Sequence, residues 1–183
     1  MSDMNEWTLK AETLLVLRCQ LRDPVAFEAL VTQCSGRIRY YIMRLIGPKE
    51  DLDDILQKVW LSVWTTLPRL RKPDSFRPWL YAIARTTAFQ TLRGRVIEVP
   101  LDEAIAAPEP EEDSFAPQDA AAIHAALDHM PVLHKEVLVL RFLEEMTYEE
   151  IAAVVGCSVG TVRSRIHYGK KSLRRIMEES TDV

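Results

Sequence analysis

The sequence has 183 residues, of which 48% are hydrophobic, and a formal net charge of −4. This length fits one or two domains, and the composition is sufficient for folded cores. No apolar run approaches the roughly 18 residues of a membrane span, and the N-terminus lacks the basic-then-apolar pattern of a signal peptide. We therefore expect a cytoplasmic protein with no membrane insertion. Cys19, Cys34 and Cys157 form no CxxC pair, which predicts reduced thiols instead of a disulfide framework or a zinc site.

The histidines do not form a metal-binding pattern. His124, His129 and His134 are five residues apart, which places neighbours about 140° apart on a helix, and Pro131 interrupts the series. The sequence also has no HExxH motif, no Gly-rich phosphate loop and no nucleophile paired with a base. We expect no metal, no cofactor, no small-molecule substrate and no enzymatic activity.

The charge is segregated along the chain. Residues 1–95 carry fifteen basic and ten acidic side chains, whereas residues 96–124 carry eight acidic and no basic ones. Residues 125–183 carry eight basic and nine acidic side chains, and six of those basic ones lie within residues 160–175. Two basic regions thus flank an acidic strip, an order of blocks that solubility alone does not require.

The first half of the chain has helical patterns throughout. A first helix is predicted over about Leu9–Leu21, and Asp23 followed by Pro24 predicts the N-cap and first turn of a second helix. Gly47-Pro48 would end that second helix. Further helices are predicted over about Glu50–Leu67 and Ser75–Arg93. No stretch shows sustained period-2 alternation, so we expect no strands.

The acidic strip predicts a linker over residues 96–118. It contains four prolines, which lack amide donors, together with most of the like charges, which repel one another. An extended linker is therefore favoured over a packed element. Composition alone is equally consistent with an inert tether.

The most informative motif follows the linker, after two helices predicted over Asp119–His129 and Pro131–Leu143. Thr147-Tyr148-Glu149-Glu150 fits a capping box. Gly156 is placed to end that helix in a left-handed conformation, and Ser158 is placed to cap the next one. Two short helices joined in this way predict a helix-turn-helix, whose second helix enters the major groove of DNA. The basic charge of residues 160–175 points to phosphate, and a merely solvated basic helix would not account for the turn and the caps.

Two stretches of the first half carry more than core residues. In the helix after Glu50, Asp51, Asp54 and Gln57 form a polar ridge with Lys58, although the helix dipole also favours acidic residues in a first turn. Residues 69–95 interleave arginine and lysine with aromatic residues, a combination that suits single-stranded nucleic acid. Aromatic residues at helical spacing are, taken singly, more often core residues.

The order of these segments resembles one family. EDLDDILQKVWLSVW, SFRPWLYAIART, an acidic linker and TYEEIAAVVGCSVGTVRSRIHYGKKSLR are similar to the extracytoplasmic-function (ECF) sigma factors, small two-domain members of the bacterial sigma-70 family. The resemblance spans roughly residues 14–175. It implies an all-α fold with a sigma region 2-like domain (9–95), a flexible linker (96–118) and a sigma region 4-like domain (119–178).

The resemblance also implies the function and the partners. Such a protein binds the clamp and flap of core RNA polymerase, directs the enzyme to −35 and −10 promoter elements and helps to open the duplex. Most relatives are held by an anti-sigma factor. The linker would thread toward the RNA path of the polymerase, where its carboxylates could mimic a phosphate backbone; these are Glu109, Glu111, Glu112 and Asp113.

The resemblance assigns residues to three surfaces. The polymerase-binding candidates are Asp51, Asp54, Gln57, Val59 and Trp60. The candidates for −10 recognition and melting are Arg71, Lys72, Asp74, Ser75, Phe76, Arg77, Trp79, Arg85 and Thr86. The candidates for −35 recognition are Gly160, Thr161, Arg163, Ser164, Arg165, His167 and Lys171. Lys58, Thr86 and Gln90 depart from the residues usual in the family.

Within the second helix of the motif, Arg163 or Arg165 could pair with guanine edges. Lys170, Lys171 and Arg174 fit phosphate or polymerase contacts, whereas Ile166 and Leu173 are expected in the core. A helix-turn-helix repressor or activator is the alternative class. It would bind duplex DNA alone and would need a sensor or dimerisation domain, and the aromatic and basic segment before the linker disfavours it.

Overall fold

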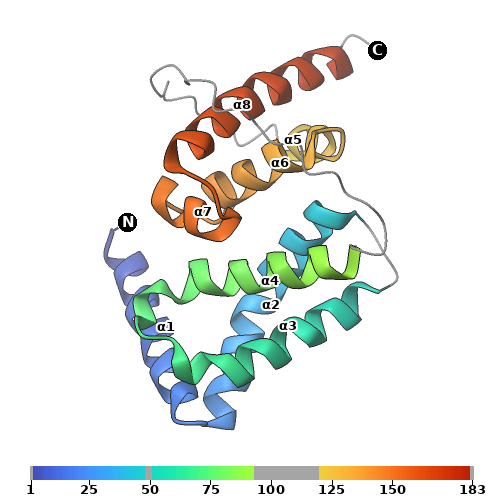
Figure 1. The fold of residues 1–183 in the computed structure, drawn as a ribbon. Helices are drawn as coiled ribbons and strands as arrows, with labels where there is room; N and C mark the ends of the chain where they lie inside the picture. The colour runs from blue at the N-terminus through green and yellow to red at the C-terminus, as the bar shows by residue number, and fades with distance from the viewer. Residues whose placement is uncertain (1, 48–50, 93–119, 182–183) are drawn as a thin grey trace.

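A computed structural model describes residues 2–47, 51–92 and 120–181. The first half comprises helices α1 (Ser2–Gln20), α2 (Pro24–Ile46), α3 (Leu52–Thr66) and α4 (Phe76–Leu92), and Figure 1 shows them below the second half. The second half comprises α5 (Ala120–Asp128), α6 (Val132–Leu138), α7 (Tyr148–Val155) and α8 (Val159–Thr181). Within these ranges every regular element is helical, which confirms the predicted all-α fold. The predicted linker, residues 96–118, lies outside the described residues.

Helix α2 begins and ends where its sequence predicts. The Asp23 carboxylate accepts hydrogen bonds from the backbone N–H groups of Val25 (3.0 Å) and Ala26 (3.2 Å). Pro24 occupies the first turn, where its missing N–H is not needed. At the other end Gly47 has a φ of 76°, a conformation that glycine adopts without steric cost, and its N–H binds the Met43 carbonyl at 2.8 Å.

The remaining bounds in the first half differ slightly from those predicted. Helix α1 begins at Ser2, earlier than the predicted Leu9, and α3 begins at Leu52 with Asp51 as its N-cap residue. A 3₁₀ turn, η1 (Leu67–Arg69), follows α3 because Pro68 cannot continue an α-helix. A second 3₁₀ turn, η2 (Pro73–Ser75), leads directly into α4.

The helix-turn-helix has the predicted geometry. The Thr147 hydroxyl accepts the Glu150 N–H at 3.2 Å, and the Glu150 carboxylate accepts the Thr147 N–H at 2.8 Å, which completes the capping box. Gly156 ends α7 in the left-handed region, with φ 71° and ψ 40°. The Ser158 hydroxyl then accepts the Thr161 N–H at 3.1 Å and so caps α8.

The segment before α7 contains a departure from the single helix predicted over Pro131–Leu143. Helix α6 ends at Leu138, and a π-helical turn, η4 (Val139–Leu143), follows it. The Glu144 N–H binds the Val139 carbonyl at 3.2 Å, an i to i+5 bond that widens the backbone. A hydrogen bond of 2.9 Å from the Arg141 guanidinium to the Met146 carbonyl stabilises the exit from this turn.

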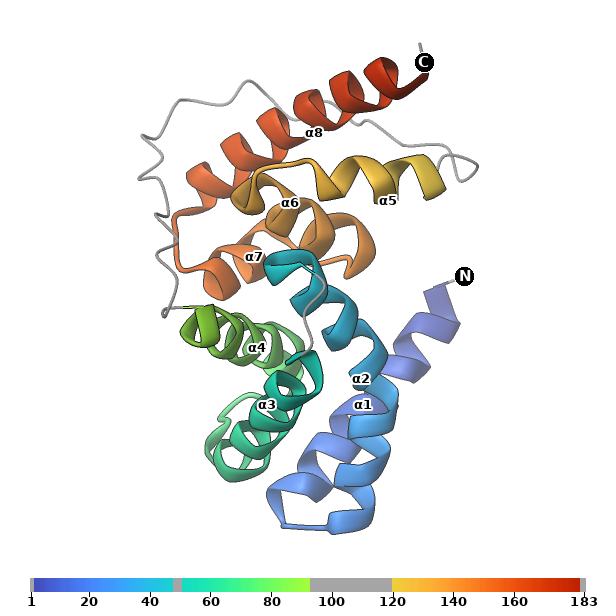
Figure 2. The ribbon, with the colours of Figure 1, turned by 90° about the vertical axis from the view of Figure 1, so that its right-hand side faces the viewer.

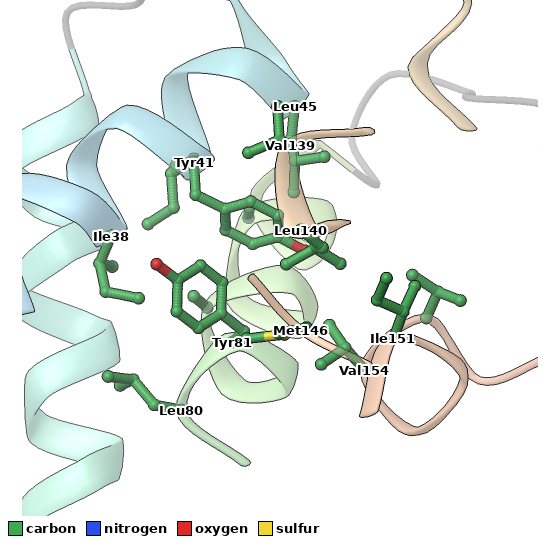
Figure 3. Packing of buried hydrophobic residues seen from close by; sticks show 14 of the residues in the cluster. Ile38, Tyr41, Leu45, Leu80, Tyr81, Val139, Leu140, Met146, Ile151 and Val154 are labelled. Atoms are coloured by element: carbon green, nitrogen blue, oxygen red, sulfur yellow. The ribbon is translucent and has the colours of Figure 1, made fainter. Parts of the chain in front are cut away.

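The two halves pack against each other, and one apolar cluster extends across both (Figures 2 and 3). Tyr41 of α2 and Tyr81 of α4 meet edge to face, with ring centroids 4.9 Å apart. Leu140 of the π-helical turn and Ile151 of α7 reach the same cluster from the second half. The two regions therefore share a common core in the part of the chain that the structure describes.

No helix among the described residues is both long and apolar enough to cross a bilayer. The three cysteines form no disulfide in this structure: Cys19 is buried, and Cys34 and Cys157 are partly buried.

Candidate polymerase and DNA interfaces

The polar ridge of α3 lies on the molecular surface. Asp51, Asp54 and Gln57 are exposed, and Lys58 is exposed beside them. Val59, predicted as part of the same surface, is fully buried in the core instead. Trp60 is half-buried and packs edge-on against Phe27, with ring centroids 6.2 Å apart. The surface available to a partner is thus the acidic and polar side of the helix.

One residue of this surface was not predicted from the sequence. Leu61 is 63% exposed, although the apolar pattern of the helix favours burial at such positions. It lies seven residues after Asp54 and four after Gln57, so all three share one side of the helix. The spacing from Asp54 is the signal that could have identified it.

The turn before α4 presents basic and polar side chains. Arg71, Lys72, Asp74 and Ser75 are all exposed on or beside η2. The turn is held to α1, because the Gln20 side chain donates a 2.7 Å hydrogen bond to the Leu70 carbonyl. This stretch therefore offers two cations on an anchored backbone.

The candidates on α4 are less accessible. Phe76 is 1% exposed and packs near Trp79, with ring centroids 6.1 Å apart. The Arg77 Nε donates to both carboxylate oxygens of Glu12, at 2.9 and 3.0 Å. Thr86 is exposed, and its hydroxyl binds the Ala82 carbonyl of the preceding turn at 2.8 Å. Phe76 and Arg77 are thus engaged in packing and ion pairing within the first half.

Helix α8 divides its candidates between two sides. Gly160, Arg163 and Lys171 are exposed, while Thr161 and His167 are partly buried. The Arg163 guanidinium lies over the Tyr148 ring, 5.9 Å from its centroid. In contrast, Ser164 and Arg165 are only 9% and 8% exposed. Ile166 and Leu173 are buried, as predicted.

The buried side of α8 faces a carboxylate that was not predicted as a functional residue. Glu136 of α6 is buried between the two halves, and its Oε1 accepts hydrogen bonds from the Arg85 Nε and the Tyr41 hydroxyl, each at 2.8 Å. Burial raises the pKa of Glu136, while the positive charges of Arg85 and Arg165 and these two hydrogen bonds act in the opposite direction. The Arg85 guanidinium also lies 4.9 Å from the Phe89 ring centroid.

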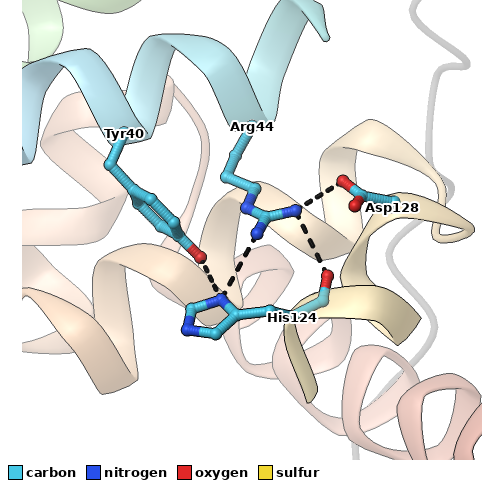
Figure 4. Close-up of polar contacts among 4 residues, drawn as sticks. All are labelled: Tyr40, Arg44, His124 and Asp128. Atoms are coloured by element: carbon cyan, nitrogen blue, oxygen red, sulfur yellow. Dashed lines mark hydrogen bonds and ion pairs between the residues drawn. The ribbon is translucent and has the colours of Figure 1, made fainter. Parts of the chain in front are cut away.

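A second polar cluster joins α2 to α5 (Figure 4). The Tyr40 hydroxyl and the His124 Nδ1 lie 2.7 Å apart, and the Arg44 guanidinium lies 3.3 Å from the same nitrogen. A guanidinium only donates, so Nδ1 can only accept in the contact with Arg44. Arg44 also binds the His124 carbonyl at 3.2 Å and pairs with Asp128. His124 is therefore a contact between the two halves.

The sequence carries a signal for Glu136. Leu133, Glu136, Val137 and Leu140 follow i, i+3, i+4, i+7 spacing, so the carboxylate occupies a position of the buried stripe. A charge at such a position requires a partner, but no local rule says that the partners are Tyr41 and Arg85. No group of His, Cys, Asp and Glu within the described ranges is arranged to hold a metal ion.

Comparison with known proteins identifies both halves. The family model for sigma-70 region 2 matches residues 30–96, and the model for sigma-70 region 4 matches residues 120–173. The RNA polymerase sigma-H factor of Pseudomonas aeruginosa is 30% identical, over 93% of this chain and 96% of that protein. The chain belongs to the ECF sigma factors of the sigma-70 family. The ECF sigma-E factor of Escherichia coli K12 is 29% identical to this sigma factor. The match covers 88% of this chain and 92% of the Escherichia coli protein.

Solved structures share the fold of this sigma factor. CnrH in complex with the cytosolic domain of CnrY aligns with a TM-score of 0.67 at 24% identity, covering 92% of this chain and 98% of CnrH. The sigma factor RpoE of Bartonella quintana, in complex with the anti-sigma factor NepR, aligns with a TM-score of 0.64 at 22% identity, covering 83% and 96% of the two chains. As an ECF sigma factor the protein is not an enzyme; it directs RNA polymerase in transcription initiation.

Proposed function

We propose that three exposed surfaces divide the work of this sigma factor: the α3 ridge binds the polymerase clamp, the turn before α4 engages the −10 element, and the start of α8 reads the −35 element. The observation that carries this assignment is the capped helix-turn-helix with Gly160 and Arg163 exposed at the start of its second helix. That geometry is the one by which a recognition helix enters the major groove.

For the −35 element, Arg163 is the leading candidate for base contact. A guanidinium can donate two hydrogen bonds to one guanine, which gives a discrimination of about 1–3 kcal/mol. Its position over Tyr148 limits the orientations of the side chain before DNA binds. The exposed Lys171, eight residues further along, fits a phosphate contact that sets the register.

For the −10 element, the exposed Arg71 and Lys72 provide the required charge. Capturing a base from the duplex costs a few kcal/mol of unstacking, so cationic contacts to the backbone must accompany it. The anchored turn places both cations next to Asp74 and Ser75, whose side chains can hydrogen-bond to a base or sugar.

For core polymerase, Asp54 and Gln57 with the neighbouring Leu61 form a surface of mixed character: charged, polar and apolar. Such a composition is typical of a specific protein interface, in which an apolar contact is surrounded by polar groups. Val59 supports this surface from the core instead of contacting the partner, given its burial.

The remaining features of the proposal concern the whole chain. The domains extend over 9–95 and 119–178, the acidic linker of 96–118 enters the RNA path of the polymerase, and the protein acts in the cytoplasm. An anti-sigma factor is proposed as a further partner. The solved relatives support it, since CnrH was determined with CnrY and RpoE with the anti-sigma factor NepR.

Site-specific photocrosslinking tests the three assignments together. A photoreactive amino acid is placed at Asp54, Lys72 or Arg163, one at a time, and each protein is assembled with bacterial core polymerase and a mapped promoter. We expect crosslinks to the largest polymerase subunit, the −10 strand and the −35 duplex, respectively. Glu28, which is exposed on α2 outside these surfaces, is the control position. Crosslinks at Arg163 no stronger than those at Glu28 would contradict the −35 assignment.

A further inference from the structure

The contact between the two halves is centred on a buried charge. Glu136 is 1% exposed, and its two hydrogen-bond donors, Tyr41 and Arg85, both belong to the other half of the molecule. Arg165 of α8 adds a second positive charge from its own half. The second carboxylate oxygen, Oε2, has no hydrogen-bond partner among the described residues.

We call the arrangement in which the two halves pack together the closed state. This state depends on the hydrogen-bond donors that the first half supplies to Glu136. A carboxylate taken out of water is costly, and only the nearby cation and hydrogen-bond donors compensate for it. If the halves separate, water solvates Glu136 and the cost disappears. If they stay together while Arg85 is removed, the charge remains buried with only Tyr41 and Arg165 facing it, which is far less favourable.

The same carboxylate engages an arginine assigned to promoter DNA. Arg85 belongs to the proposed −10 region, yet its Nε donates to Glu136 of the other half. The Arg85 side chain is only 21% exposed in this state, and separation of the halves would break its bond to Glu136.

Other contacts reinforce the closed state around this centre. Arg44 pairs with Asp128, and Arg37 lies 3.8 Å from the Glu144 carboxylate, so two further ion pairs join the halves. The Tyr81 ring packs at the contact between the two halves, among Leu140, Met146 and Ile38 (Figure 3).

We propose that Glu136 is an interdomain latch, which keeps the unbound sigma factor closed and holds Arg85 away from promoter DNA until the domains separate on the polymerase. The latch rests on the proposed function only through the role of Arg85. The closed state itself can be measured without polymerase or DNA.

The native cysteines provide the assay. Cys34 borders a cavity of about 250 Å³ between the halves, which Arg37 and Tyr81 line from one side and Glu144 from the other. Cys19 is buried within the first half, so its modification reports unfolding instead of separation. The full-length protein is treated with a thiol reagent, and mass spectrometry follows the modification of each cysteine with time.

Two variants and a rescue give the decisive comparison. Arg85→Leu leaves the Glu136 charge buried with one partner fewer, so we expect Cys34 to react at least about tenfold faster while Cys19 stays protected. Adding Glu136→Leu removes the orphaned charge and should return the Cys34 rate to within about threefold of wild type. Arg175→Leu, at an exposed position of α8, is the matched control and should leave the rate unchanged.

An unchanged Cys34 rate in Arg85→Leu, or a double variant as reactive as the single one, would overturn the latch. If Arg85→Leu exposes Cys19 as well and so has unfolded, Tyr41→Phe replaces it, since that change removes only the hydroxyl donated to Glu136. It should still accelerate Cys34 labelling severalfold, and no acceleration would overturn the proposal. Transcription by the wild-type protein with core polymerase separately tests the proposed function. A failure of the proposed function can therefore be told apart from a failure of the latch.

Discussion

Tyr41 and Glu136 are separated by 95 positions in the sequence, yet the Tyr41 hydroxyl donates a 2.8 Å hydrogen bond to the Glu136 carboxylate. The bond joins the region 2 helices to the region 4 helices of one sigma factor. Burial raises the pKa of the Tyr41 hydroxyl, and the neighbouring Glu136 charge raises it further, so the hydroxyl keeps its proton and stays a donor. The contact between region 2 and region 4 is thus polar at its centre and apolar around it.

We predict that reversing a charge on the polar ridge of α3 weakens polymerase binding. Asp54→Arg reverses an exposed charge on the proposed clamp surface, and we expect core polymerase to bind about tenfold more weakly or worse, because like charges placed across an interface repel. Binding can be followed by fluorescence anisotropy of the labelled sigma factor. Glu28→Arg, an equal charge change at an exposed position of α2, is the control. Equal affinities for both variants would remove Asp54 from the interface.

The recognition helix predicts a change of promoter selectivity. Arg163→Ala should weaken holoenzyme binding to the −35 element by about 1–3 kcal/mol and relax base preference at one position. Competition between wild-type and base-substituted promoters measures both effects. Arg175→Ala, near the end of the same helix, should leave the preference intact. Retained selectivity in Arg163→Ala would shift the base contact to another residue of α8.

Substitutions of two glycines, one in the turn of the helix-turn-helix and one inside α2, are predicted to have opposite effects on stability. Gly156 has a φ of 71°, so Gly156→Ala should destabilise the protein by about 1 kcal/mol. Gly36 lies inside α2, where a methyl group added to its Cα would meet nothing within 4 Å, so Gly36→Ala should stabilise the protein by about 0.5–1 kcal/mol. Urea denaturation followed by circular dichroism compares the two. Stabilisation by Gly156→Ala would show that the left-handed turn is not maintained in solution.

The N-cap of α2 predicts an acid-dependent loss of stability. Hydrogen bonds from the Ala26 N–H and the Arg18 side chain lower the pKa of Asp23 below its ordinary value of 3.8. A lowered pKa means that the stabilisation is complete above 3.8 and is lost as the pH falls through the lower, folded-state pKa. Asp23→Asn keeps the capping oxygen but removes the charge, so its stability should fall less steeply over this acid range. Thermal melts between neutral and acidic pH measure how steeply the stability falls with pH. Parallel curves for the wild type and Asp23→Asn would exclude Asp23 as a source of the acid-dependent loss of stability.

Local rules were sufficient for much of the fold. The caps at Asp23 and Thr147 and the left-handed Gly156 depend on neighbours within a few residues, so the sequence determines them directly. The π-helical turn was missed because its i to i+5 bond, from Glu144 to Val139, has no sequence pattern distinct from that of an α-helix.

The arrangement of the candidate site was harder to predict. Exposure of Asp54 and Arg163 follows from their positions on amphipathic helices, whereas burial of Arg165 and Val59 depends on which side of each helix meets its neighbours. The contact of Arg85 with Glu136 joins residues 51 positions apart, across the acidic linker. Helical periodicity identifies a buried position such as that of Glu136, but it does not identify the distant partner that makes the burial tolerable.

A distance measurement across the two halves tests the closed state most directly. Spin labels at Ala29 of α2 and Glu178 of α8, both exposed, are introduced into a chain whose native cysteines are replaced by serine. Pulsed electron paramagnetic resonance then compares the unbound sigma factor with the holoenzyme. We predict one narrow distance distribution for the unbound protein and a different one once core polymerase is bound. The same distribution in both states, or a broad one in the unbound protein, would contradict the closed state.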